Sequence, residues 1–438
     1  MDLVNFMNRR NMSPRPVLDD LDRRRLIAQV TDREGLAAHL AGGSRTVYCG
    51  FDPTADSLHI GSLVPLLTLA RFQRAGHRPI ALVGGATGLI GDPSFKQAER
   101  ALNERDVVAH WVECIRAQVG HFLDLEGNNA ALVVDNLEWT REMDVITFLR
   151  DVGKHFSVNA MMHKEAIHAR LTQPNAGISF TEFSYIILQS MDFMELARRH
   201  GCTLQVGGSD QWGNITSGLD LIRRTLSREA YALTMPLVTK SDGTKFGKTE
   251  SGSIWLDAKK TSPYGFFQFW LNTADDDLER FLAFFTFLEV EEIQEIVEES
   301  RRAPERRIGQ RKLAEAITRL VHGDGAVESA ERIGRALFAD ELHALTREDL
   351  EQLQIDGLPV THVDESEPGL LACMTAAGLA ASRGAARKLI QSRGVSVNGT
   401  LVVDEALALD RNRALFGRFH LIRKGKKTWH LAVHSPAP

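Results

Sequence analysis

A polar turn rich in small residues joins two apolar segments near the start of this 438-residue chain. Residues 46–51 are a short apolar run, residues 63–70 a longer one, and residues 52–62 between them read Asp-Pro-Thr-Ala-Asp-Ser-Leu-His-Ile-Gly-Ser. This order predicts a strand that turns directly into a helix. Backbone N–H groups at a helix start have no partner inside the helix, and the helix dipole favours negative charge there. The turn is therefore a candidate anion site, with Thr54 and His59 as further donors.

Short apolar runs alternate with helical stretches through the first half of the chain. Further strands are expected at 79–84, 130–135 and 203–206. Such alternation predicts an α/β fold, with helices on both faces of a parallel sheet and ligands at the carboxyl ends of its strands. From Thr261 onward the pattern becomes helical. The helices expected there cover residues 266–271, 278–288, 293–301 and 305–321.

Composition excludes several classes of protein. A hydrophobic content of 43% and a charged content of 25% are typical of a globular protein. No apolar run approaches the roughly 20 residues that span a bilayer, and charges interrupt the first ten residues, unlike a secretory signal. We therefore expect a cytoplasmic protein with no membrane partner. The scattered cysteines show no Cys-x-x-Cys spacing, which predicts free thiols and no structural zinc site. They are Cys49, Cys114, Cys202 and Cys373.

One candidate ligand-binding helix carries three polar residues on one face. Tyr185, Gln189 and Asp192 are spaced i, i+4 and i+7, so about 100° per residue places them in a narrow arc. Such a stripe usually faces solvent. Here the neighbours, including Phe183 and Met191, are strongly apolar, which predicts a buried helix whose polar face meets partners.

Two loops after expected strands add further polar groups. Residues 84–94 form a glycine-rich loop that contains Asp92, and residues 206–215 contain Asp210 and Gln211 after a pair of glycines. A lone glycine-rich loop is as often a simple turn as a ligand cradle. Strand ends in a parallel sheet share one edge, so both loops are candidates for the same cleft.

A second basic motif changes the interpretation of the polar turn. A His-x-Gly sequence after a strand, as at His59 and Gly61, is more often an ordinary helix start than a ligand site. Lys245-Phe-Gly-Lys248-Thr249 lies almost 190 residues later. Together the two motifs predict an ATP site of the kind that forms aminoacyl adenylates.

The C-terminal part of the chain is basic. From Leu371 to Pro438 there are 11 Lys and Arg against three acids, a net charge of +8 that leaves −13 for the rest. Residues 382–394 predict a helix with a basic stripe and a glycine stop, and residues 395–403 a hairpin around Asn398-Gly399. This arrangement resembles the RNA-binding domain named after ribosomal protein S4 and favours nucleic acid as a partner over a merely solvated face. The residues expected to bind RNA are Arg383, Arg387, Lys388 and Arg393.

Over essentially its whole length the chain resembles the bacterial tyrosyl-tRNA synthetases, which are class I aminoacyl-tRNA synthetases. Five motifs match in order: residues 48–61, the Gly91-Asp-Pro-Ser loop, the Tyr185 helix, residues 208–211 and residues 245–249. The resemblance implies a homodimer with a Rossmann-like catalytic domain, a helical anticodon-region domain and an S4-like tail. The implied boundaries are 1–234, a lysine-loop linker at 235–262, a helical domain at 263–360, a linker at 361–370 and a tail at 371–438.

The resemblance also implies a role for each matching residue. Tyr48 and Asp192 would meet the phenolic hydroxyl of tyrosine. The charged end of tyrosine would be met by Asp92, Tyr185, Gln189 and Gln211. ATP would be met by Cys49, Gly50, Asp52, Gly61, Ser62, Lys96, Arg100, Gly208, Asp210 and Lys248. The residues implied in catalysis are Thr54, His59, Lys245, Lys248 and Thr249.

The implied reaction needs no general base. The tyrosine carboxylate is already ionised and attacks the α-phosphate of ATP in line, so the barrier lies in approaching two anions and stabilising the departing pyrophosphate. Lys245 and Lys248 suit that role. Mg²⁺ is implied on the phosphates rather than in a protein cage. In a second step a terminal ribose hydroxyl of tRNA(Tyr) attacks the adenylate.

One departure and two alternatives accompany this interpretation. Ser62 stands where many relatives carry histidine or asparagine, which predicts altered ribose contacts rather than loss of activity. A tryptophanyl synthetase or small nucleotidyltransferase would share His59 and the lysine motif without needing Tyr48 and Asp192. A noncatalytic RNA-binding protein on the same scaffold would not need Asp92. Tyrosine-dependent pyrophosphate exchange separates these alternatives.

Overall fold

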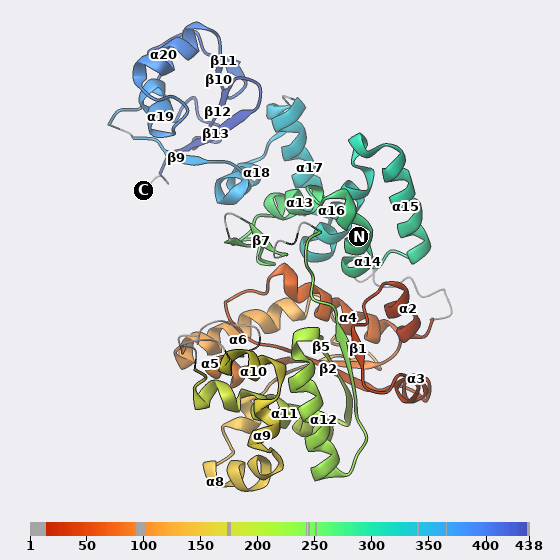
Figure 1. Ribbon diagram of the computed structural model, residues 1–438. Coiled ribbons are helices and arrows are strands. Elements are labelled where there is room, and N and C mark those ends of the chain that lie inside the picture. The colour runs from red at the N-terminus through yellow and green to blue at the C-terminus, as the bar shows by residue number, and fades with distance from the viewer. Residues whose placement is uncertain are drawn as a thin grey trace. The chain divides into compact units, whose positions relative to one another are not determined.

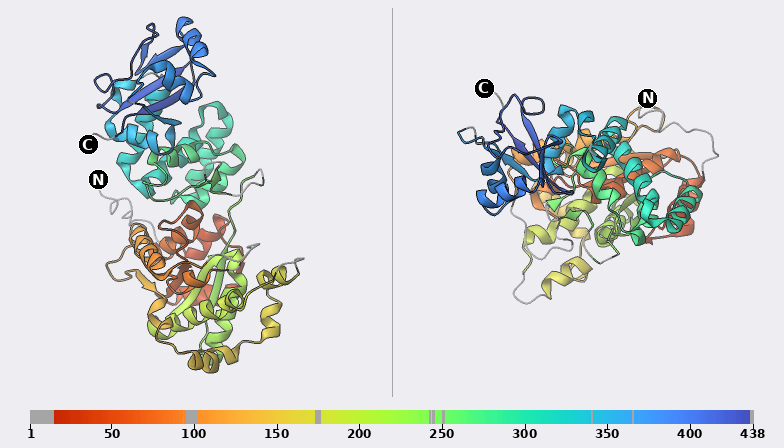
Figure 2. Two further views of the ribbon diagram at one scale, coloured as in Figure 1. Left: turned by 90° about the vertical axis from the view of Figure 1, so that its left-hand side faces the viewer. Right: turned by 90° about the horizontal axis from the view of Figure 1, so that it is seen from above.

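The computed structural model describes residues 15–92, 94, 102–172, 177–241, 243, 246–249, 252–339, 341–364 and 366–435 (Figures 1 and 2). The chain divides into two compact units, one of residues 1–256 with 274–302 and one of residues 257–273 with 303–438. Each unit is described by itself. The five domain boundaries expected from the sequence stay a prediction.

A six-stranded sheet forms the centre of the first unit, in the order β1-β6-β5-β2-β3-β4. The strands are β1 (Gln29–Val30), β2 (Thr46–Phe51), β3 (Arg78–Val83), β4 (Leu132–Asp135), β5 (Cys202–Gly208) and β6 (Tyr231–Met235). Neighbours from β6 to β4 pair in parallel, as the alternating pattern predicted. The prediction missed β6, and it missed β1, an antiparallel edge strand of two residues. So short a strand leaves no period in the sequence.

Helices lie on both sides of this sheet (Figure 2). The helices of the first unit are α2 (Val17–Arg23), α3 (Arg33–Ala41), α4 (Leu63–Arg74), α5 (Thr87–Ile90), α6 (Arg105–Val119), α7 (Leu137–Thr140), α8 (Val145–Thr147), α9 (Val158–Met162), α10 (Glu165–Leu171), α11 (Phe180–His200), α12 (Trp212–Leu226), α14 (Asp275–Phe285) and α15 (Val290–Arg302). Short 3₁₀ helices lie at Ile60–Ser62, Gly153–His155 and Ser209–Gln211, and a π-helical turn lies at Phe148–Val152. A short hairpin joins β7 (Lys248–Thr249) to β8 (Gly252–Ser253).

Helix α11 illustrates how local sequence sets the position of a buried element. The Ser179 side chain accepts a hydrogen bond from the Glu182 N–H at its start, and Gly201 ends it with a φ of 62°, which a residue without Cβ adopts at little cost. Phe193 on this helix is fully buried against Tyr48 of β2, with ring centroids 5.1 Å apart. The polar residues of α11 are therefore carried on an element fixed in the core.

The second unit joins a helical part to a five-stranded sheet ordered β11-β10-β12-β13-β9. Its helices are α13 (Pro263–Leu271), α16 (Ile308–His322), α17 (Asp324–Ala339), α18 (Arg347–Gln352), α19 (Leu370–Ala376) and α20 (Arg383–Gln391), with helical turns at Pro304–Arg306, Leu342–Ala344 and Leu353–Gly357. Its strands are β9 (Val360–His362), β10 (Val395–Val397), β11 (Thr400–Leu401), β12 (Phe419–Lys424) and β13 (Thr428–Val433). The predicted Asn-Gly hairpin is confirmed, since β10 pairs antiparallel with β11 and both turn residues have positive φ.

Strand β9 lies where the sequence suggested only a linker. Residues 361–362, at the start of the expected linker, pair in parallel with Ala432 and Val433 of β13. The small sheet therefore begins before residue 371. An edge strand is bonded on one side only, so its polar composition resembles that of a loop. No helix among the described residues is both long and apolar enough to cross a membrane, and the four cysteines are free.

Candidate functional site

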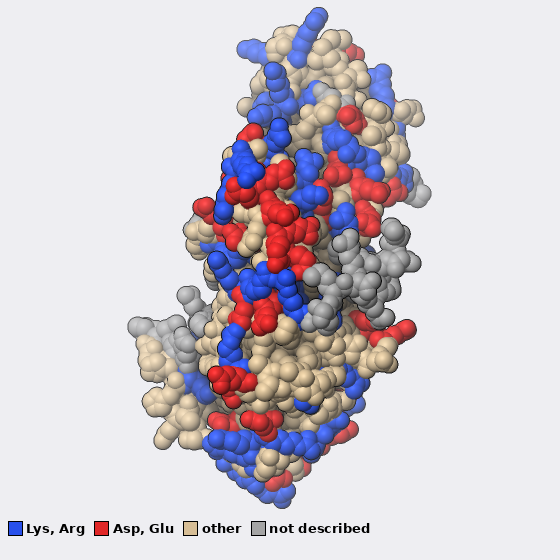
Figure 3. Space-filling view, turned by 90° about the vertical axis from the view of Figure 1, so that its right-hand side faces the viewer, with Lys and Arg blue, Asp and Glu red and all other residues tan. Residues whose placement is uncertain are grey.

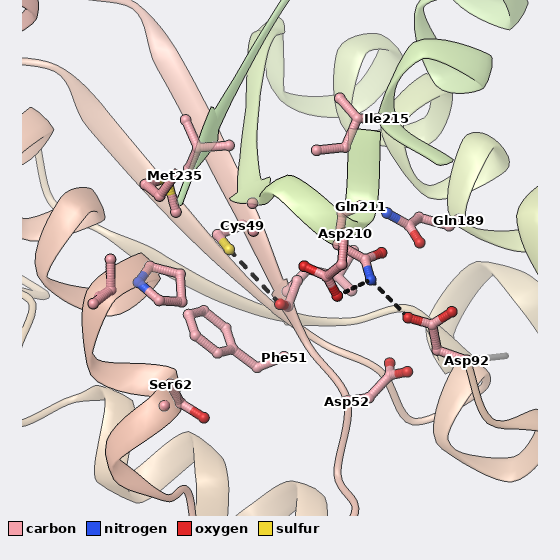
Figure 4. Close-up of a pocket in the computed structure, with 18 of the residues that line it drawn as sticks. Cys49, Phe51, Asp52, Ser62, Asp92, Gln189, Asp210, Gln211, Ile215 and Met235 are labelled. Carbon is pink, nitrogen blue, oxygen red and sulfur yellow. Dashed lines mark hydrogen bonds between the residues drawn. The ribbon is translucent and has the colours of Figure 1, made fainter. Parts of the chain in front are cut away.

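A cavity of about 360 Å³ opens at the carboxyl ends of the central strands in the first unit (Figure 4). It brings together most of the residues singled out from the sequence. Those that line it are Tyr48, Cys49, Gly50, Asp52, Thr54, His59, Gly61, Ser62, Asp92, Tyr185, Gln189, Asp192, Gly208, Asp210 and Gln211.

The turn after β2 is shaped by its histidine. His59 caps the helical turn Ile60–Ser62 that leads into α4, and its Nδ1 accepts a hydrogen bond from the Gly61 N–H at 3.0 Å. A Cβ at Gly61 would lie 2.7 Å from the His59 ring, so a larger residue there would displace the ring from its capping position. Thr54 and His59 are both exposed at the cavity. This is the helix start that the sequence suggested for an anion.

Tyr185 and Asp52 connect α11 to the end of β2. The Tyr185 hydroxyl donates to Asp52 Oδ2 at 2.6 Å, and the Thr87 hydroxyl donates to Oδ1 at 2.6 Å. Burial, followed by the Asp52 carboxylate, raises the pKa of Tyr185 well above its usual value, so the phenol stays protonated and donates. Asp52 therefore places a carboxylate at the cavity wall, and each of its two oxygens accepts a hydrogen bond.

Asp192 lies on the same face of α11 and is 2% exposed. Its Oδ1 accepts from the Trp139 indole and its Oδ2 from the Asn136 amide, both at 2.9 Å. Burial raises the pKa of Asp192 to about 7, and these two donors offset part of that rise. The group is poised to ionise fully when a further donor arrives from the cavity.

Tyr48 carries an unsatisfied buried hydroxyl. Its side chain is 1% exposed and lines the cavity, and among the described residues its oxygen has no hydrogen-bond partner. Burial, followed by the Asp192 charge, raises the pKa of Tyr48 well above its usual value. A buried hydroxyl without a partner costs free energy in the empty site. It is therefore suited to a polar group on a ligand.

Gln211 lies at the centre of a second hydrogen-bonded group. Its Nε2 donates to Asp92 at 2.7 Å and to Asp210 at 3.0 Å, and Figure 4 shows the amide between the two carboxylates. Asn214 donates both to Gln211 Oε1 at 3.1 Å and to Gln189 Oε1 at 3.0 Å. The group presents two carboxylates to one side of the cavity, which favours a cationic or hydroxyl-bearing ligand there.

Sequence reasoning missed the residues behind these groups. Asn136 and Trp139 follow β4 and hold Asp192, while Thr87 joins Asn136 to Asp52 through bonds of 3.1 and 2.6 Å. Gln205 of β5 also lines the cavity, and its buried Oε1 has no partner among the described residues. The available signal was the position of residue 136 immediately after an apolar run, since strand ends of a parallel sheet meet at one edge.

Several predicted residues fall elsewhere. Lys96, Arg100 and Lys245 lie outside the described residues, as do the side chains of Lys248 and Thr249, whose backbone forms β7. Residues expected to contact RNA are exposed on or just after α20 in the second unit: Arg383, Arg387, Lys388 and Arg393. Two of them form exposed ion pairs, Arg383 with Glu367 at 2.7 Å and Arg387 with Glu405 at 2.8 Å. The described residues contain no group of three or more His, Cys, Asp or Glu arranged for a metal ion.

Comparisons with known proteins show which proteins this chain is similar to. Residues 41–339 match the family model described as tRNA synthetases class I (W and Y), and residues 349–432 match the tyrosine–tRNA ligase SYY-like C-terminal domain. The chain is 58% identical to the tyrosine–tRNA ligase of Aliivibrio fischeri strain MJ11, over 95% of this chain and 98% of that protein. It is 57% identical to that of Chromobacterium violaceum, over 96% and 99%. The crystal structure of a C-terminally truncated mitochondrial tyrosyl-tRNA synthetase from Aspergillus nidulans covers 74% of this chain and 94% of its own, with a TM-score of 0.67 and 29% identity.

Proposed function

This chain belongs to the class I tyrosyl-tRNA synthetases, and from that membership we propose that the cavity in the first unit holds tyrosyl-adenylate. The reaction of the chain is the ATP-dependent activation of tyrosine, with release of pyrophosphate, followed by transfer of tyrosine to tRNA. The observation that carries the assignment of the cavity is the Tyr48 hydroxyl, unpartnered among the described residues, beside the hydrogen-bonded Asp192 carboxylate.

We propose that these two groups select the phenol. The substrate hydroxyl donates to Asp192 and accepts from Tyr48, so one ligand atom satisfies both. Phenylalanine leaves both buried groups without that partner, which costs more than the absence of one bond alone. Tyrosyl-tRNA synthetases are themselves the standard example of such rejection, at roughly 10⁵-fold, so that magnitude belongs to the family.

The opposite side of the cavity suits the charged end of tyrosine. We propose that Asp92, Tyr185 and Gln189 hold the ammonium group and that Gln211 lies near the carboxylate. What supports this is the negative charge of Asp92 and of Asp52, to which Tyr185 donates. A ligand cation there gains charge-assisted hydrogen bonds.

ATP is proposed to lie along the turn after β2. Thr54, His59 and the positive end of the α4 dipole suit its phosphates. Residues proposed around the nucleoside and ribose are Cys49, Gly50, Gly61, Ser62, Gly208 and Asp210. Burial raises the pKa of Cys49 to about 12, so its thiol is neutral and acts as a weak donor rather than as a nucleophile.

The chain's own residues contribute positioning and charge to the chemical step. The in-line attack of a carboxylate on the α-phosphate needs no proton transfer, so two anions must be brought together and the leaving group stabilised. Lys245 and Lys248, with Lys96 and Arg100, are proposed to supply positive charge. Mg²⁺ is proposed to arrive on the triphosphate as part of the substrate, because it prefers phosphate oxygens and water.

We propose a second copy of this chain as a partner of the first unit. Several apolar side chains between residues 145 and 180 are strongly exposed, including Val145 at 71%, Ile146 at 68% and Phe180 at 76%. Large apolar residues gathered within a short stretch are typical of an interface. Homodimerisation is checked by sedimentation equilibrium of the full chain and of Ile146→Glu.

The basic tail is proposed to contact tRNA(Tyr). Lys and Arg side chains project from the upper end of the face in Figure 3, which the C-terminal part of the chain forms.

We propose the cytoplasm as the site of action, because tRNA charging supplies translation. One assay tests the whole assignment: tyrosine should stimulate exchange of pyrophosphate into ATP, tryptophan should not, and a noncatalytic scaffold would show no exchange.

A further inference from the structure

One face of α14 contacts the beginning of the lysine segment, defined here as residues 239–249. Asp277 is 2% exposed, and both its oxygens accept from the Ser241 N–H at 3.1 Å. The Ser241 hydroxyl also donates to Asp277, at 3.1 Å. Arg280, on the next turn, donates to the Thr239 carbonyl and to Asp277. A buried carboxylate therefore fixes the backbone where the lysine segment begins.

The same face of α14 also holds the described middle of the segment. Phe246 packs against Phe281 and Phe285, with ring centroids 5.1 and 5.2 Å apart. Asp277, Phe281 and Phe285 are spaced four residues apart, so they form one stripe along the helix. Phe246 lies between Lys245 and Lys248 in the sequence. Two separate contacts with one stripe thus hold Ser241 and Phe246, two described residues of the segment.

Ile254 links the lysine segment to the turn that carries His59. The Ile254 N–H donates to the Gly247 carbonyl at 3.1 Å, and the Ile60 N–H donates to the Ile254 carbonyl at 3.0 Å. Gly247 has a φ of 78°, and a Cβ there would lie 3.0 Å from the Ile60 side chain. The two segments proposed to bind phosphate are therefore close neighbours.

The far end of α14 is fastened to the helix that follows this turn. Arg71 of α4 donates to the carbonyls of Thr286 at 2.6 Å and Ala283 at 3.2 Å. Arg24 of the α2 end donates to Leu288 at 2.8 Å and to Ala283 at 3.3 Å. Carbonyls at a helix C-terminus lack intrahelical donors and attract cations. Helix α14 is thus bonded at one end to α4 and at the other to the lysine segment.

We propose that α14 positions the lysine segment relative to the His59 turn for adenylate formation, with Asp277 and the Phe246–Phe281 pair as positioning residues. The proposal rests on the proposed function and deepens it. Stabilising the leaving pyrophosphate depends on where positive charge is held, and a misplacement of about 1 Å costs roughly 10²-fold in rate. Asp277 does not line the cavity and acts through its hydrogen bonds with Ser241 and Arg280.

The first test compares Asp277→Asn with Glu279→Gln, a carboxylate-to-amide change on the same helix. Glu279 is exposed and its described ion pair is with Arg301, so it serves as the matched control. We expect Asp277→Asn to lower kcat of tyrosine-dependent pyrophosphate exchange by roughly 10- to 100-fold. The tyrosine Kd should stay at the control value. Phe246→Ala should also lower kcat of this exchange, and it leaves the sequence of α14 unchanged.

A double-mutant cycle separates positioning from a general structural effect. If Asp277 acts through the lysine segment, Asp277→Asn should cause much less further loss of rate in a Lys248→Ala background than in the wild type. Additive effects on the rate, an unchanged kcat in both single variants, or a parallel loss of tyrosine binding would each overturn the proposal. Absence of tyrosine-dependent exchange in the wild type would instead overturn the proposed function.

Discussion

The Tyr185 hydroxyl donates a 2.6 Å hydrogen bond to the Asp52 carboxylate and so ties α11 to the residue that follows β2. From Asp52 the bonds continue through Thr87 and Asn136 to Asp192, which lies on α11 again. The two ends of the proposed tyrosine pocket are therefore parts of one hydrogen-bonded network. Networks of this kind respond together when one member is removed.

Tyr185→Phe should lower both stability and tyrosine affinity. Half-buried Asp52 loses a hydrogen bond from a buried donor, and a hydrogen bond to a charged group contributes about 1.5–3 kcal/mol. The urea midpoint of the free enzyme and the Kd for tyrosine report the two effects. An unchanged midpoint together with an unchanged Kd would show that the bond contributes nothing.

Tyr48→Phe should behave differently, because its hydroxyl has no partner among the described residues of the free protein. The urea midpoint should stay unchanged or rise. The tyrosine affinity should fall by about 0.5–1.5 kcal/mol, the net value of one hydrogen bond, while phenylalanine binding should not weaken. Calorimetric titration with both amino acids measures this, and a loss of stability like that of Tyr185→Phe would contradict the assignment.

The raised pKa of Asp192 predicts a pH dependence. Its pKa is about 7 in the folded protein against an ordinary value of 3.8, so between these values the folded state binds more protons than the unfolded state. The free energy of unfolding should therefore fall as pH rises from about 3.8 to about 7 and level off above. Tyrosine affinity should rise between about pH 3.8 and about pH 7, because the substrate phenol donates its hydrogen bond to ionised Asp192.

Asp192→Asn isolates the contribution of Asp192 protonation to the free energy of unfolding. Urea unfolding of both proteins at several pH values, from about 4.5 to about 8, should show the wild type losing stability relative to the variant as pH rises. Parallel profiles would show that Asp192 does not titrate as its burial implies.

Basic residues of α20 should affect tRNA charging without affecting adenylate formation. Replacing Arg387 and Lys388 by Ala should weaken tRNA binding and lower the slope of log affinity against log salt by about one for each phosphate that is no longer neutralised. Arg302→Ala, on α15 of the first unit, is the control. Equal charging by the double variant and the control would exclude this helix as an RNA-binding element.

The sequence predicted the elements whose pattern is local. Strand β2, the turn at His59 and helix α11 were all predicted because apolar runs and a three-residue polar stripe are visible within one window. The hairpin at Asn398 followed from the chemistry of its turn. Part of the cavity was predicted in the same way, since strand ends of a parallel sheet share one edge, whereas Tyr48, Cys49, Gly50 and Gly208 were expected only from the resemblance.

The rest depends on contacts between distant residues. Asn136 and Trp139 lie more than 50 positions from Asp192, and an amide and an indole have no spacing that marks them as its donors. Asp277 is likewise 36 positions from Ser241. Strand β9 was missed because an edge strand of three residues has the composition of a loop.

The network from Tyr185 to Asp192 limits how this enzyme can be re-engineered for another amino acid. A designer who replaces Asp192 to admit a substrate without a phenol also alters what Asn136 and Thr87 must bond, and through them the carboxylate beside the substrate's amino end. Libraries confined to residues that line the cavity would leave Asn136 and Trp139 matched to a carboxylate that is no longer there. Varying Asn136, Trp139 and Thr87 in the same library gives specificity and rate a chance to recover together.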